Sequence, residues 1–303
     1  MSMWKALSVM GLVGVMGVGS ALAYEEVTVG NGGSLSGRVT LNGDVPQPKG
    51  YNLVTFPDPI FCGRISTGSG WRLLQPFTVS PNGGFQNVVV SLINIEKGKK
   101  FEAPTPRIEA IDCKFEPYIT VVRDQHKVDV VNLDPVMHDI QAYETSDLGA
   151  RVLFNVPLPM SERLTKSELL KKVTVKNRAG KVMTQPVKMR KGRNIFVMQC
   201  GFHAYMESWG VAVDHPYYTL TDKEGNFTIG DIPPGTYQVS VWHPMVNQEF
   251  TVTIEAGTTS QHDIQFDAPK GRLYANALEE TPRFGMELLG DAVIDPIVEK
   301  QVP

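Results

Sequence analysis

Alternating apolar and polar residues run through most of the chain after residue 24. Short stretches in which every second residue is apolar are typical of half-buried β-strands. Six of them cover residues 38–41, 87–92, 127–131, 194–198, 236–241 and 249–254. Segments rich in Gly, Asn, Asp and Pro separate the strands, at 42–44, 81–84, 178–180, 224–226 and 233–235. Turn chemistry at this spacing predicts an all-β protein built from sandwiches with few short helices.

Helix signals are sparse. Thr165-Lys166-Ser167-Glu168 is a capping-box pattern ahead of two leucines, and it predicts one short helix. Residues 287–289 are a second candidate. Because residues 268–303 lack sustained periodicity, we expect a C-terminal tail that packs on the surface.

The first 23 residues have the pattern of a secretory signal. Lys5 precedes the uncharged stretch 6–20, and Ala21-Leu22-Ala23 forms an A-x-A cleavage site. The apolar stretch is shorter than the roughly 20 residues that span a bilayer. We therefore expect cleavage after Ala23 and a periplasmic or secreted protein without a transmembrane segment; a retained N-terminal anchor is the alternative.

Length and composition predict about two globular domains. The chain has 303 residues, of which 42% are hydrophobic and 20% charged. Its net charge of −3 argues against a uniformly basic nucleic-acid-binding protein. Residues 161–193 differ from the rest, because eleven Lys or Arg face two Glu there. This basic segment is either a solvated hairpin or a docking face for an acidic partner.

One loop combines several metal-binding residue types. Cys200, His203 and Met206 follow the predicted strand 194–198 at intervals of three, and another strand resumes at 210. His138 follows the strand at 127–131. Two imidazoles, a thiolate and a thioether match the trigonal copper sites that transfer electrons. Soft sulfur ligands suit Cu(I), and imidazole suits both oxidation states.

The same residues resemble a known family. Cys200-x₂-His203-x₂-Met206 before a Val-rich strand resembles the copper loop of the cupredoxins, most of all the amicyanin type. Asn132-x-Asp134-x₃-His138 is similar to the family's strand-end histidine motif, and 115–122 resembles the strand that leads into it. The resemblance spans about 108–213. It implies a Greek-key β-sandwich that holds one type 1 copper ion through His138, Cys200, His203 and Met206.

Two features depart from that family. Asp139 stands where cupredoxins commonly have the Asn that ties the two ligand loops together, so the hydrogen bonds around the ligands are open to question. The stretch between His138 and Cys200 is also long, and the basic segment fills it.

The three cysteines bear on the ligand set. If Cys200 stays a thiolate for copper, Cys62 and Cys113 remain to form a disulfide. The alternatives are that Cys200 pairs with one of them or is a small buried apolar residue. Of the other histidines, we expect His126 in an exposed turn and structural roles for His215, His243 and His262.

The C-terminal part resembles a second family. Residues 218–229 and 232–239 look like the carboxypeptidase regulatory-like, or prealbumin-like, β-sandwich. Gly225 and Gly235 are expected at positive φ in its turns. Because about 50 residues are too few for a complete sandwich, we expect its first strands at 37–43 and 88–92. Separate N- and C-terminal domains are the alternative.

These observations divide the chain as follows: signal peptide 1–23, N-terminal β region 24–107, cupredoxin-like domain 108–214, regulatory-like sandwich 215–267 and tail 268–303. The leading hypothesis is an exported electron carrier for redox protein partners. They would dock near the basic segment, at an exposed edge of His203 ringed by Met137, Phe202 and Ala204; Met137 and Phe202 as core residues are the alternative.

Other function classes fit less well. Copper enzymes need further histidines, usually in His-x-His pairs, and the chain has none. A binuclear copper centre needs a second cysteine beside Cys200, and the loop has none. We therefore expect no enzymatic activity. A copper-free structural or binding protein of the cell envelope is the alternative function.

Overall fold

The computed structural model describes residues 24–63, 65–66, 70–145, 149–161, 180–270 and 297–298. The predicted signal peptide, both predicted helices and most of the tail lie outside these residues, as do residues 162–179 of the basic segment. No helix in the described ranges is long and apolar enough to span a membrane.

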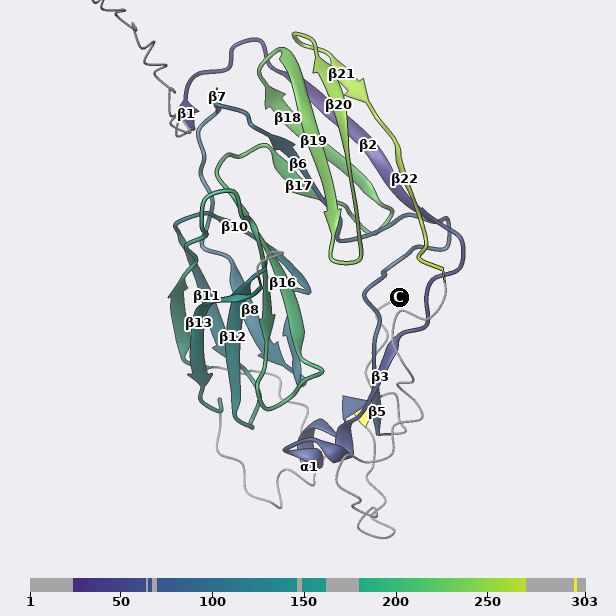
Figure 1. The fold of residues 1–303 in the computed structure, drawn as a ribbon, viewed down its shortest axis with the longest axis vertical. Helices are drawn as coiled ribbons and strands as arrows, with labels where there is room; N and C mark the ends of the chain where they lie inside the picture. Colours follow the sequence, from purple (N-terminus) through teal and green to yellow (C-terminus); the bar gives the residue numbers. More distant parts are fainter. Residues whose placement is uncertain are drawn as a thin grey trace, which may run out of the picture.

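The described chain is almost entirely β-structure, which confirms the all-β prediction (Figure 1). Its N-terminal third contains β1 (Glu25–Glu26), β2 (Gly33–Asn42), β3 (Lys49–Asn52), η1 (Leu53–Thr55), α1 (Pro59–Cys62), β4 (Ile65–Ser66), β5 (Trp71–Leu74), β6 (Val89–Ile93) and β7 (Lys97–Gly98). The middle contains β8 (Arg107–Ile111), β9 (Lys114–Glu116), β10 (Ile119–Arg123), β11 (Lys127–Asn132), β12 (His138–Glu144), β13 (Arg151–Leu158), β14 (Val182–Pro186), β15 (Ile195–Gln199) and β16 (Glu207–Val213). The C-terminal part contains β17 (Tyr218–Leu220), β18 (Asn226–Ile232), β19 (Gly235–His243), β20 (Val246–Ile254), β21 (Thr259–Gln261), β22 (Ile264–Asp267) and β23 (Ile297–Val298).

Strands β8–β16 form the central sandwich. One sheet has the order β10-β16-β15-β12-β13 and the other has the order β14-β11-β8-β9. Alternate residues of the strands are buried, as in β8, and their apolar side chains fill one core. Each strand therefore points one row of side chains inward, and the loops between strands gather at the two ends.

Strands β2, β6 and β17–β22 form the flanking sandwich. β6 pairs with β17 and β19, and β2 pairs with β18, β21 and β22. Strands from before and after the central sandwich therefore share one core. This pairing supports a discontinuous sandwich into which the central sandwich is inserted, and we propose that division of the chain.

The two expected turn glycines of the flanking sandwich differ. Gly225 has φ of +81°, and a Cβ there would lie 2.2 Å from the Val39 carbonyl oxygen, so this turn requires glycine. Gly235 is not at positive φ, and that prediction was wrong. Gly235 is the first residue of β19, which starts directly after Pro233-Pro234, and it has the extended conformation of that strand.

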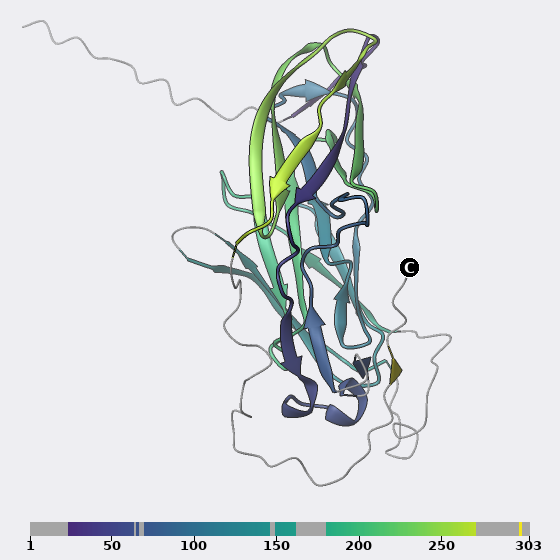
Figure 2. The same ribbon diagram turned by 90° about the vertical axis from the view of Figure 1, so that its right-hand side faces the viewer.

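The two sandwiches lie end to end (Figures 1 and 2). They share a small cluster of buried apolar side chains. Val89 of β6 packs there with Ile119 and Val211 of the central sandwich. Trp209 and Trp242 also approach across the boundary, with ring centroids 6.2 Å apart. Burial of these side chains favours a fixed arrangement of the two sandwiches.

A long excursion between β2 and β6 leaves the flanking sandwich and passes under the far end of the central one (Figure 1). We call its residues 49–63 the cap; they comprise β3, η1 and α1. Within the part of the chain that the structure describes, β3 pairs with β5 of the same excursion. Leu53, Phe61 and Cys62 of the cap are buried in the core of the central sandwich.

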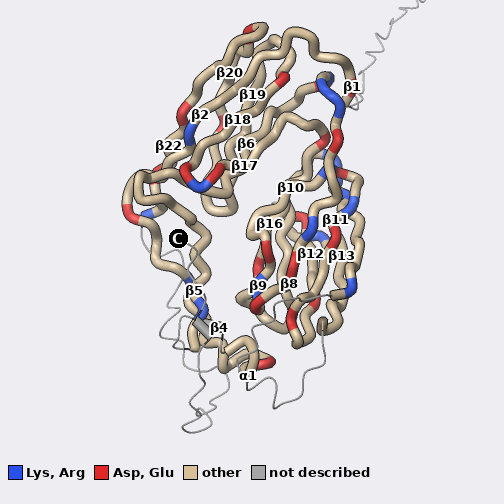
Figure 3. The backbone as a smooth tube through the Cα atoms, turned by 180° about the vertical axis from the view of Figure 1, so that it is seen from behind, with Lys and Arg blue, Asp and Glu red and all other residues tan. Residues whose placement is uncertain are grey.

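Charges of both signs are interspersed over the described chain (Figure 3).

At the end of β12 the buried carboxylate of Glu144 accepts hydrogen bonds from Arg151 Nη2, from Arg193 Nη1 at 3.0 Å and from the Arg190 amide at 2.9 Å. These bonds, that of Arg151 foremost, lower the pKa of Glu144 to about 2. Part of the basic segment is thus tied to the fold.

We predict that Glu144→Gln lowers the free energy of unfolding at pH 7 by about 2 kcal/mol. The pKa of this carboxyl is lower in the folded state, so its contribution is complete above the unfolded-state pKa of 4.5 and disappears as pH falls toward 2. Urea unfolding between pH 3 and pH 7 measures the difference. Glu102→Gln, at an exposed pair with Lys100, serves as the unchanged control. Equal stability of wild type and Glu144→Gln at pH 7 would contradict the assignment.

Candidate metal centre

Three of the four predicted ligands meet at the cap end of the central sandwich. His138 begins β12, Cys200 follows β15, and His203 lies in the loop from β15 to β16. β12 and β15 are antiparallel, with Gln141 opposite Gln199. This register brings the start of β12 beside the loop that follows β15, so strand pairing places the three side chains together.

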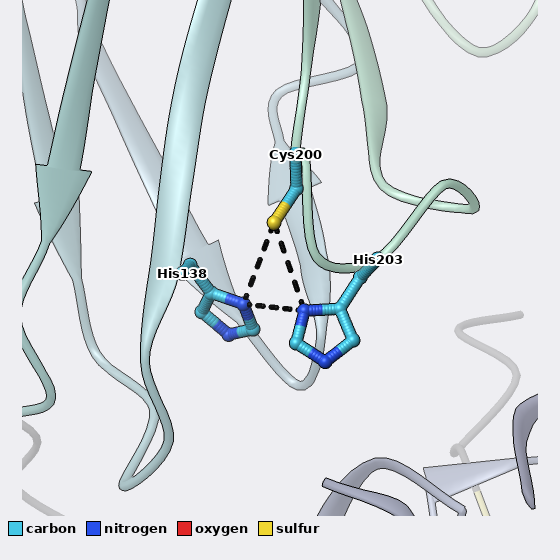
Figure 4. A group of neighbouring side chains, drawn as sticks. All are labelled: His138, Cys200 and His203. Carbon is cyan, nitrogen blue, oxygen red and sulfur yellow. Dashed lines mark hydrogen bonds between the residues drawn. The ribbon is translucent and has the colours of Figure 1, made fainter. Parts of the chain in front are cut away.

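The three donor atoms form a compact triangle (Figure 4). His138 Nδ1 and His203 Nδ1 are 3.1 Å apart, and Cys200 Sγ lies 4.0 Å and 3.6 Å from them. A trigonal site with ligand bonds of about 2.0–2.3 Å requires donor separations of about 3.5–3.8 Å. The side chains are therefore placed to hold one metal ion with small adjustments.

Both imidazoles use their other nitrogen for the protein. His138 Nε2 lies 3.0 Å from Asp134 Oδ2, and His203 Nε2 lies 3.1 Å from the Pro57 carbonyl oxygen. A ring that donates its Nε2–H to these acceptors presents the lone pair of Nδ1 to the centre of the triangle. Such partners fix the orientation and tautomer of histidine ligands.

Burial sets the protonation of the metal-free site. It raises the pKa of the Cys200 thiol to about 12. Burial, helped by the neighbouring His138, lowers the pKa of His203 to about 4. At neutral pH the His203 ring is therefore an available ligand, and Cys200 must release its proton when a metal binds.

Met206, the fourth predicted ligand, is fully buried in the same core cluster as Cys200. The Cys200 amide donates to the Met206 carbonyl at 3.2 Å, and the Met206 amide donates to the His203 carbonyl at 2.8 Å. Backbone hydrogen bonds thus close residues 200–206 into a compact loop, which keeps its three donor residues close together.

Asp139 links the two ligand loops. It stands at the position where cupredoxins commonly have an Asn with that role. Its Oδ1 accepts from the Gly201 amide at 2.5 Å, and its Oδ2 accepts from Gln141 Nε2 at 2.7 Å. A Cβ on residue 201 would lie 2.8 Å from Asp139 Oδ2, so a larger residue there would displace the carboxylate from its present position. The carboxylate joins the His138 strand to the Cys200 loop.

The expected exposed edge of His203 is not present, and this prediction was wrong. His203 is fully buried because Pro57 and Asp58 of the cap lie over its Nε2, with Asp58 Oδ2 at 3.7 Å. Met137 and Phe202 are exposed, at 41% and 44%, which excludes their role as core residues. Sequence reasoning missed the cap because Pro57 and His203 are far apart along the chain.

The remaining cysteines and histidines lie outside the triangle. Cys62 and Cys113 are joined by a disulfide, and Cys200 is the free cysteine of the described residues. His126 is exposed in the turn before β11. The others have protein partners: His215 Nε2 lies 2.9 Å from the Leu92 carbonyl oxygen, His243 Nε2 lies 3.1 Å from that of Pro76, and His262 stacks on Phe250.

Comparisons with known proteins find one matching protein family and several similar solved structures. Residues 210–267 match the carboxypeptidase regulatory-like domain. No curated protein sequence matches the chain significantly.

Solved structures similar to parts of the chain include cupredoxins. A purple cupredoxin from Nitrosopumilus maritimus is 17% identical over 36% of this chain and 99% of its own, with a TM-score of 0.25. Amicyanin from Paracoccus versutus is 11% identical over 41% and 97%, with a TM-score of 0.23. A copper-containing nitrite reductase from Thermus scotoductus is 13% identical over 41% of this chain and only 25% of its own, with a TM-score of 0.25.

We predict that Asp139→Ala weakens metal binding about 10–100-fold, because the Cys200 loop loses its link to β12. Asp139→Asn retains an oxygen acceptor for the Gly201 amide and is expected to bind within a few-fold of wild type. Competition with a copper chelator measures both affinities. Equal affinity of wild type and Asp139→Ala would show that this link does not hold the site.

Proposed function

We propose that the chain is an exported mononuclear type 1 copper protein that transfers electrons between redox partners. The triangle of His138 Nδ1, His203 Nδ1 and Cys200 Sγ carries this proposal. The signal-like residues 1–23 and the Cys62–Cys113 disulfide support a periplasmic or secreted location, where disulfides persist.

The donor set favours copper over zinc. Structural zinc sites are closed by four Cys or His ligands, and catalytic ones use three protein ligands with water in the fourth position. Here Met206, in the same loop, would supply a weak thioether, which suits copper. The nearby carboxylate of Asp134 already accepts from His138 Nε2 and from the Asp112 and Cys113 amides.

Each residue has a defined task in this proposal. When bound, copper supplies one-electron redox chemistry by changing between Cu(I) and Cu(II). The two imidazoles and the thiolate hold their positions because strand ends, Asp134 and Asp139 fix them. Rigid ligands limit rearrangement between the two oxidation states, and burial excludes water from the site.

An electron carrier also needs a surface for its partners. Met137 and Phe202 each directly precede a proposed ligand in sequence and are exposed, so they are candidates for contact with a partner. The basic segment 161–193 would attract an acidic partner, although Arg193 within it is bound to Glu144. We propose electron carriage and no catalytic activity.

The proposal predicts an intense visible thiolate-to-copper band when the mature protein receives Cu(II). Cys200→Ser is expected to abolish the band, because the thiolate is lost. Cys62→Ser is expected to retain it. Visible absorption and metal content by mass spectrometry test all three proteins. A wild-type protein that shows no band would overturn the copper proposal and favour the alternative, a copper-free structural or binding protein of the envelope.

A further inference from the structure

The cap covers the outer side of His203, next to the donor triangle, and its strand β3 pairs with β5 rather than with a strand of either sandwich. In Figure 1 the excursion that contains the cap runs from the flanking sandwich to the far end of the central one, and in Figure 4 purple chain lies below His203. Pro57 accepts from His203 Nε2 at 3.1 Å, and Cys62 Sγ lies 4.0 Å from the same nitrogen. The side of the ring turned away from the donor triangle therefore faces the cap.

Two sets of contacts hold the cap in place. The Cys62–Cys113 disulfide joins it covalently to the turn between β8 and β9. Phe56 and Tyr51 pack edge-on against Tyr205 of the ligand loop, with ring centroids 5.2 Å and 6.1 Å away. α1 has only four residues and cannot be stable alone, so these contacts fix its position.

The disulfide also connects the cap to the second histidine. The Cys113 amide donates to Asp134 Oδ2 at 2.8 Å, and the same oxygen lies 3.0 Å from His138 Nε2. The cap thus reaches His203 through Pro57 and His138 through Cys113 and Asp134. Both imidazoles depend on partners that the disulfide holds together.

We propose that the cap is a working part of the metal site: Pro57 is a positioning residue that fixes the ring of His203, and the Cys62–Cys113 disulfide keeps the site closed to solvent. The positioning of a metal ligand rests on the proposed function. Closure of the site over Cys200 does not, because it concerns the metal-free protein. The two parts can therefore fail separately.

Labelling of Cys200 by a thiol reagent tests closure in the metal-free mature protein. The double variant Cys62→Ser/Cys113→Ser retains the same single thiol as oxidised wild type, so rates compare directly. We expect labelling about tenfold faster in the double variant, because access then requires only local opening of the cap. Labelling within twofold of wild type would overturn closure by the disulfide.

A second variant tests the cap if the double variant does not fold. Phe56→Ala retains the disulfide and removes a contact with Tyr205, and we expect labelling several-fold faster. Phe250→Ala is the matched control, because that ring stacks on His262 in the flanking sandwich. Equal rates for Phe56→Ala and Phe250→Ala would overturn the role of the cap.

The copper-loaded double variant tests positioning. We expect it to retain a visible band at a shifted wavelength and to release Cu(I) to a chelator about tenfold faster than wild type. An unchanged band and an unchanged release rate would overturn positioning by the cap. If wild type binds no copper, the proposed function fails, while the labelling result still decides whether the cap closes the site.

Discussion

The buried carboxylate of Asp134 is the contact on which the ligand end of the central sandwich depends. It accepts from the amides of Asp112 and Cys113, at 2.7 Å and 2.8 Å, and pairs with His138 Nε2. Asp112 and Cys113 both have positive φ, as a two-residue hairpin turn of this kind requires. Neither is glycine, so the turn is strained, and the two hydrogen bonds to Asp134 offset that strain. The same turn carries the disulfide. One side chain therefore orients a proposed ligand, stabilises a turn and places Cys113 for its bond to the cap.

The donor triangle follows from strand register and from a segment remote in the chain. Pairing of β12 with β15 places His138 beside the Cys200 loop, and Asp139 then links the two. The cap supplies the partner of His203, which lies 146 residues away in sequence. The excursion that carries the cap leaves the flanking sandwich after β2 and returns to it at β6, so that sandwich anchors both ends of the segment that covers His203.

The sequence predicted features that depend on local pattern and missed those that depend on distant contacts. Alternation is a local property, so the predicted strands 127–131 and 236–241 correspond to the observed strands Lys127–Asn132 and Gly235–His243. The spacing of Cys200 and His203 likewise reports a single loop. Burial of His203 was not predictable, because Pro57 carries no signal that it will lie under the ring. The role of Asp139 was open for a related reason: whether a carboxylate replaces an amide depends on how closely Gly201 approaches it. The φ of Gly235 was mispredicted because Pro-Pro-Gly is typical of a turn, whereas here the strand begins at the glycine itself.

Burial of His203 is compatible with electron transfer, although it excludes direct contact of a partner with the ring. An electron needs a short separation between donor and acceptor, whereas a metal ion or a thiol reagent needs an opening. Pro57 is exposed and is one hydrogen bond from His203 Nε2, so the ring is covered by a single layer of chain. Under the proposal, exchange of a metal would, in contrast, require movement of the cap, which a disulfide and an aromatic cluster hold in place. In the proposed copper carrier the cap would thus meet two separate requirements: the ligands would lie near the surface, and the metal would still be retained.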